Sequence, residues 1–131
     1  MPGQIVPQLI HKDAPYIFRL IKENRLQDLM DLLDSRKSRV RVMRIKDVRE
    51  YTLLTFCALQ NNLLALKLLY EHAKMFDEHN ASDLVLKEWV NHQTDKGYCA
   101  LHFAAYNNNL EMTKYLLETL DANMHILNNW D

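Results

Sequence analysis

The sequence predicts an all-α protein, a solenoid of about three helix–turn–helix repeats, on the basis of three observations. A short helical segment, an Asn-containing break and a longer Leu-rich helical segment recur three times along the 131 residues. Apolar residues in the longer segments are spaced three and four apart, which is the period of an amphipathic helix. Each break has an Asn at the matching position, namely Asn24, Asn61 and Asn108.

The first repeat is predicted over residues 15–35, after an extended segment of residues 1–14. Pro15 lies where a first helical position would be, and the helix that it begins ends at Asn24. The apolar stripe of the second helix runs from Leu26 to Leu33. A helical hairpin with one buried side follows from this pattern.

The second repeat is predicted over residues 50–77 and the third over residues 97–120. Successive break Asn residues are 37 and 47 positions apart, so insertions are expected at residues 36–49 and 74–92. In the second insertion, Ser82 is predicted to N-cap a short helix. We expect this helix to pack on the stack as a lid rather than to bind a partner.

The backbone conformation of a helix turn explains why Asn occurs at all three breaks. A tight turn between antiparallel helices needs a residue in the left-handed region, where Gly is best and Asn is the usual second choice. The chain has only two glycines, Gly3 and Gly97. Because no two glycines lie close together, Gly-rich phosphate-binding loops are excluded as well.

The third unit resembles the ankyrin repeat, whose pattern is a turn Gly followed by T-P-L-H-x-A-A. Residues 97–109 read GYCALHFAAYNNN. The matching residues are Gly97, Leu101, His102, Ala104 and Ala105. The second unit keeps Thr52, Leu54 and Ala58 of the same pattern. The resemblance is closest over residues 97–117, less close over 50–73 and faint over 15–33, where a degenerate N-terminal capping repeat is expected.

This resemblance implies an ankyrin-repeat solenoid with finger-loop insertions that acts as a non-catalytic protein–protein interaction module or scaffold subunit. It also implies that His102 is a structural histidine and that the small Ala104 and Ala105 let neighbouring repeats pack closely. By the family pattern, the concave partner-binding face comprises Tyr51, Phe56, Leu59, Gln60, Tyr98, Phe103, Tyr106 and Asn107. The alternative for Phe56 and Phe103 is partial burial between repeats.

Residues 36–49 form the most distinctive local stretch. They contain seven Lys/Arg and one acidic residue, Asp47, and so carry +6, while the net charge of −1 leaves −7 for the rest of the chain. Alternation of basic and apolar residues predicts a strand or hairpin with one basic face. The basic finger residues are Arg39, Arg41, Arg44, Lys46 and Arg49.

Two interpretations of this basic finger remain open. It could dock an acidic partner peptide, an anionic lipid head group or a phosphate backbone. The alternative is a solvated loop whose Arg residues pair with the chain's own acids. Nucleic acid is the less favoured ligand, because the stretch lacks the aromatic residues on which bases stack.

No catalytic residue, metal site or cofactor is expected. The six histidines and two cysteines show none of the spacings of a zinc site. Cys57 and Cys99 are interpreted as reduced thiols, with Cys57 in the core. Without a secretory signal or an apolar run of roughly 20 residues, a cytoplasmic location is expected.

Residues 121–131 look like the start of a further hairpin. The C-terminal face of the stack would then be open, so either the sequence is part of a longer protein or a partner covers that face. One alternative function is therefore the N-terminal ankyrin part of a larger enzyme or channel, for example a protein acyltransferase. The other is a basic-patch binder of anionic lipid or nucleic acid.

Overall fold

The structure, a computed structural model, describes residues 13–36, 40–77 and 82–126, and it confirms the predicted all-α repeat fold. The α-helices are α2 (Ala14–Lys22), α3 (Leu26–Arg36), α4 (Leu53–Leu59), α5 (Leu63–His72), α6 (Asp83–Val90), α7 (Ala100–Tyr106) and α8 (Leu110–Lys114). Single π-helical turns extend α5 and α8, as η4 (Ala73–Asp77) and η5 (Tyr115–Thr119). The predicted hairpin start at residues 121–131 is described only to residue 126, and residues 1–12 lie outside the described part of the chain.

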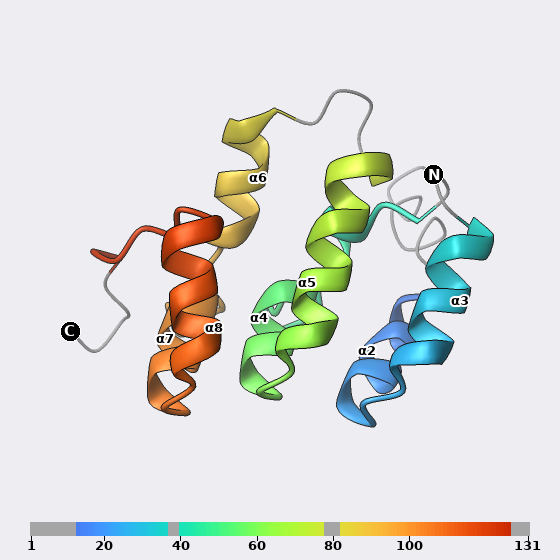
Figure 1. Cartoon of the computed structure of the whole chain (residues 1–131), viewed down its shortest axis with the longest axis horizontal. Coiled ribbons are helices and arrows are strands. Elements are labelled where there is room, and N and C mark those ends of the chain that lie inside the picture. Colours follow the sequence, from blue (N-terminus) through green and yellow to red (C-terminus); the bar gives the residue numbers. More distant parts are fainter. Residues whose placement is uncertain (1–12, 37–39, 78–81, 127–131) are drawn as a thin grey trace.

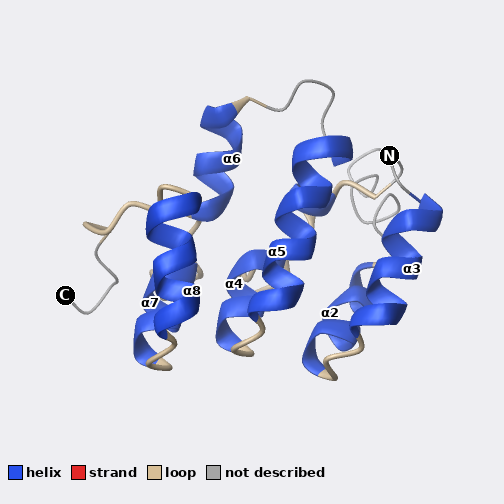
Figure 2. Ribbon diagram, in the orientation of Figure 1, coloured by secondary structure: helices blue, strands red, loops and turns tan. Residues whose placement is uncertain are grey.

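The helices form two layers (Figure 1). The shorter helices α2, α4 and α7 make one row, in which α4 packs between its two neighbours. The second row contains α3, α5 and α8, joined to the first by tight turns (Figure 2). Side chains such as Leu20, Leu54, Leu66 and Leu116 are fully buried between the rows. Each contributes about 1.5–3 kcal/mol through burial of its apolar surface.

The three helix turns share one geometry. Asn24, Asn61 and Asn108 have φ angles of 56°, 60° and 56°, all in the left-handed region. In each turn, the backbone N–H of the following residue donates to a carbonyl near the end of the first helix, as Asn62 does to Cys57 at 2.8 Å. These bonds satisfy carbonyl groups that a helix end otherwise leaves unpaired.

Asparagine side chains also connect one turn to the next, and we call this set the asparagine ladder. The amide of Asn62 donates to Asn24 Oδ1 at 3.1 Å and to the carbonyl oxygen of Ile21 at 3.2 Å. The amide of Asn109 donates to Asn61 Oδ1 at 2.7 Å. The side-chain oxygens of Asn62 and Asn109 meanwhile N-cap α5 and α8, because they accept the backbone N–H groups of Ala65 and Met112. Each of these two residues therefore starts a helix and ties it to the preceding repeat.

Two finger hairpins extend from the repeats, at residues 47–51 and 94–98. Each needs a residue with positive φ, which is Glu50 at 66° in one hairpin and Gly97 at 86° in the other. The hairpins are joined directly, because the backbone N–H of Asp95 donates to the carbonyl oxygen of Arg49 at 3.0 Å. Backbone bonding thus continues the stack beyond the helices.

Of the strand or hairpin predicted for residues 36–49, the described residues form a hairpin at residues 47–51 but no extended strand over residues 40–46. Val42–Arg44 forms a 3-10 turn (η3), and a single bridge pairs Lys46 with Thr52 where the finger hairpin begins. Val40, Val42 and Ile45 are all buried in the core. The apolar residues of the alternating pattern therefore fill the core, without a partner strand along the segment.

The lid predicted in the second insertion is confirmed. Ser82 N-caps α6, with its hydroxyl oxygen accepting the N–H of Val85 at 3.2 Å. Trp89 is buried, and its ring stacks on Tyr70 of α5 with 6.4 Å between ring centroids. A salt bridge of 2.9 Å from Lys87 to Asp121 joins α6 to the segment after η5.

The ladder should be measurable with two substitutions at one position. Asn62→Ser retains an N-cap oxygen but removes both amide donations, so we expect a loss of about 1 kcal/mol in the free energy of unfolding. Asn62→Ala removes the cap as well and should cost about 2 kcal/mol. Urea denaturation measures both values. Equal stability of Asn62→Ser and the unmodified chain would show that the ladder contributes nothing.

Repeat packing can be tested with two adjacent alanines. The structure separates them: Ala104 is fully buried, whereas Ala105 is exposed because no described element covers it. Ala104→Leu should overpack the core and cost about 1–3 kcal/mol. Ala105→Leu should change the free energy of unfolding by less than about 0.5 kcal/mol. Similar losses for the two variants, measured by urea denaturation, would contradict this packing.

Candidate protein-interaction surface

An aromatic cluster lies where the finger hairpins meet α7. The Phe103 ring stacks on Tyr51, with centroids 5.7 Å apart and planes at 28°, and lies at the same centroid distance from Tyr98. Tyr51 belongs to one hairpin, while Tyr98 and Phe103 belong to the next repeat. Burial raises the pKa of the Tyr51 hydroxyl. The cluster thus packs across a repeat junction and leaves its three rings half-buried.

Phe56 occupies the position of Phe103 one repeat earlier, 47 residues before it. Its ring meets Phe18 of α2 edge-on, at 5.0 Å between centroids and 82° between planes. Both phenylalanines are therefore partly buried between repeats. Their main contribution is to the packing of the repeat junctions.

The most accessible apolar side chains lie on the elements that carry these rings or their counterparts one repeat earlier. Leu59 and Tyr106 occupy matching positions near the ends of α4 and α7, with 39% and 88% of their surfaces exposed. Val48, in the turn of the first finger hairpin, is 97% exposed. Sequence reasoning missed Val48, although it is an apolar residue in an otherwise charged turn. We define the aromatic face as Tyr51, Tyr98, Phe103, Leu59, Tyr106 and Val48.

Gln60 and Asn107, also predicted for the concave face, are the C-caps of α4 and α7. The Asn107 amide donates to the carbonyl oxygen of Ala58 at 3.0 Å, across the junction between α7 and α4. This bond gives Asn107 a role in holding the repeats together. Gln60 is half-buried beside the helix turn, away from the aromatic cluster.

His102 connects the start of α7 to the segment that follows η5. Its Nδ1 accepts the backbone N–H of Cys99 at 2.9 Å. In the neutral ring the proton is then on Nε2, which donates to the carbonyl oxygen of Ile126 at 3.0 Å. In the second repeat the hydroxyls of Thr52 and Thr55 perform the local capping.

Comparison with known proteins identifies this architecture. The family model for ankyrin repeats in three copies matches residues 17–128. The chain belongs to the ankyrin-repeat family. A chain in the crystal structure of the yeast ribosomal protein Rps3 in complex with its chaperone Yar1 has the same fold, with a TM-score of 0.78 and 22% identity. That similarity covers 91% of this chain and 77% of the other. No curated protein sequence gives a significant match.

In this ankyrin-repeat protein, the basic finger residues interact with the chain itself. Lys46 pairs with Glu50 at 2.9 Å, and Arg49 with Asp95 at 3.8 Å. The hydrogen bond from Lys46 lowers the pKa of Glu50. The other members of the set are Arg41, which donates to the carbonyl oxygen of Phe76 at 3.5 Å, Arg44, which is exposed, and Arg39, which lies outside the described residues.

The described part of the ankyrin-repeat chain has few side chains suited to metal binding or nucleophilic catalysis. Its residues contain no group of three His, Cys, Asp or Glu side chains arranged to hold a metal ion. Cys57 and Cys99 are free and buried. Burial raises the pKa of the Cys57 thiol, which favours the unreactive protonated form. Among the described helices, none combines the length and apolar character needed to cross a bilayer.

Proposed function

We propose that this ankyrin-repeat domain is a non-catalytic protein–protein interaction module that binds its partner through the aromatic face. The observation that carries the proposal is the exposure of Val48 and Tyr106, which belong to the same hairpin as Tyr51 and the same helix as Phe103. Apolar and aromatic side chains supply most of the energy in protein interfaces, and exposed ones next to a rigid support are suited to that role.

Preorganisation is the second argument for this face. Tyr51 and Tyr98 are held against Phe103, so these rings lose little conformational freedom when a partner binds. The hairpins beneath them are fixed by the backbone bond between Asp95 and Arg49. A partner therefore meets a surface that is already in its binding conformation.

The structural neighbour supports a protein ligand. That crystal structure contains a ribosomal protein in complex with its chaperone, so a chain of this fold forms part of a protein–protein complex. For this chain we take from that likeness only the class of partner, a protein. Our proposal does not require an acidic partner, because Lys46 and Arg49 already face acidic side chains. The same pairing gives no support to binding of anionic lipid or nucleic acid.

The two cysteine thiols bear on catalysis and on the cellular compartment. The buried, protonated Cys57 fits a core residue better than a nucleophile, which agrees with a non-catalytic domain. Two free cysteines fit a reducing compartment, and we propose the cytoplasm. A larger enzyme or channel that carried this domain would use it in the same way, as its protein-binding part.

The aromatic face can be tested by comparative capture. The tagged chain and a Val48→Ser/Tyr106→Ser variant would be used to capture proteins from a cell lysate for quantitative mass spectrometry. Losing two exposed anchors should reduce the captured amount of a specific partner about tenfold or more, because truncating a central anchor costs about 1–2 kcal/mol of binding free energy. The matched control is Leu84→Ser/Met124→Ser, which removes two exposed apolar side chains elsewhere.

The control variant should capture the same partner as the unmodified chain. Equal capture by all three proteins would contradict binding through the aromatic face. If the control variant lost as much captured partner as the Val48→Ser/Tyr106→Ser variant, the effect would come from general surface apolarity and not from the aromatic face. Thermal unfolding of each variant verifies that the fold is intact.

A further inference from the structure

A groove of about 490 Å³ lies in the other helix layer, between α3 and the α5–η4 helix. One wall consists of positions 27, 30, 31 and 34, and the other of positions 68, 71, 72 and 75. Both sets have the i, i+3, i+4, i+7 spacing of a single helix stripe. Two helices thus present facing stripes of about two turns, roughly 10 Å long.

Methionine side chains form the accessible apolar part of the groove. Met30 on α3 is 46% exposed and Met75 on η4 is 70% exposed. The buried Leu33 and the half-buried Phe76 also line the groove. Methionine is flexible and polarisable, so it adapts to apolar side chains of different shapes. Two exposed methionines on opposite walls favour binding over a purely structural role.

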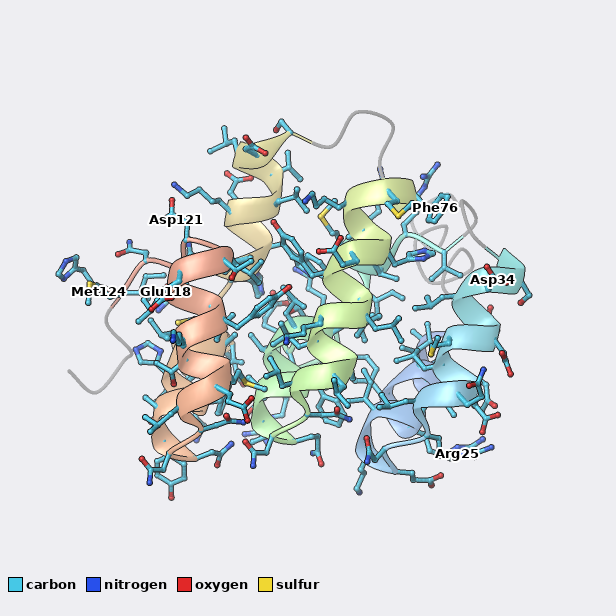
Figure 3. All side chains as sticks on the ribbon, in the orientation of Figure 1. Arg25, Asp34, Phe76, Glu118, Asp121 and Met124 are labelled. Carbon is cyan, nitrogen blue, oxygen red and sulfur yellow. The ribbon has the colours of Figure 1, made fainter. Side chains whose placement is uncertain are left out.

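The rim of the groove is acidic. Of the described residues that line it, three are acidic, namely Asp31, Asp34 and Glu71, and none is Lys or Arg. Asp31 and Glu71 are exposed and project from opposite walls. Figure 3 labels Asp34 and Phe76, which lie at the upper ends of the two walls in this view. This charge disfavours phosphate-bearing ligands and favours a cationic one.

We propose that the groove between α3 and α5 docks an amphipathic, Lys/Arg-rich helix of a partner protein. Apolar residues of that helix, one turn apart, would contact Met30 and Met75, and its basic residues would pair with Asp31 and Glu71. Helix-in-groove recognition uses such i, i+3 or i+4 anchors. This site shares no residue with the aromatic face and is independent of the function proposed above.

The test uses a fluorescent helical peptide with Leu residues one turn apart and Lys at the flanking positions, titrated with the full chain and followed by anisotropy. The same peptide with Glu in place of Lys is the charge control. At low salt we expect the Lys peptide to bind at least tenfold more tightly than the Glu peptide. This ratio of affinities should decrease as salt is added. No binding, or equal binding of the two peptides, would overturn the proposal.

Three variants locate the site. Met30→Ser/Met75→Ser should weaken binding of the Lys peptide at least tenfold. Asp31→Lys/Glu71→Lys should reverse the preference, so that the Glu peptide binds more tightly. The control Glu111→Lys/Glu118→Lys makes the same charge change at exposed positions on α8 and η5 and should retain the original preference. If the control variant also preferred the Glu peptide, the effect would come from net charge, and the proposed site in the groove would be wrong.

Other occupants give different results. If a chain lacking residues 1–12 bound the peptide at least tenfold more tightly, the occupant would be the chain's own N-terminus. If sedimentation showed a dimer that Met30→Ser/Met75→Ser dissociates, the occupant would be a second copy. Either result would overturn the proposal. The Val48→Ser/Tyr106→Ser variant should bind the peptide normally, which separates failure of this proposal from failure of the aromatic face.

Discussion

The hydrogen bonds of the asparagine ladder are the constraint on which the rest of the structure depends. At each helix turn one Asn adopts the left-handed conformation, and at the second and third turns the next Asn caps the following helix while its amide reaches back to the preceding repeat. Adjacent Asn residues therefore both form the helix turn and fix the position of one repeat relative to the preceding one. The register set in this way places Leu59 and Tyr106 at matching positions of consecutive repeats and brings the Tyr51 ring onto Phe103.

The fold was predictable where local chemistry decides the structure. Left-handed Asn61, the Ser82 cap and the helical period each depend on a few neighbouring residues. The alternating stretch around Val42 was not predictable in the same way, because alternation does not reveal whether a partner strand exists. Likewise, Ala104 is buried and Ala105 is exposed although both belong to one motif, because burial depends on which elements pack against each position.

Prediction of the candidate surface had a similar limit. The family pattern indicated the region, but individual roles depend on the adjacent repeat: Phe56 packs on Phe18, and the Asn107 amide bonds across a junction. Val48 was missed because exposure in a hairpin turn is a property of the assembled finger. The groove in the other layer requires Met30 and Met75 to face each other across two repeats, which no local pattern specifies.

The most direct test of this account is a double-mutant cycle in the ladder, with unfolding free energies measured in urea. Asn61→Gly keeps the left-handed turn but removes the accepting oxygen, and Asn109→Ser keeps the N-cap but removes the amide donor. We predict a coupling energy of about 0.5–1 kcal/mol, because each single substitution breaks the same bond. Strictly additive losses would contradict the claim that asparagine side chains tie the repeats together.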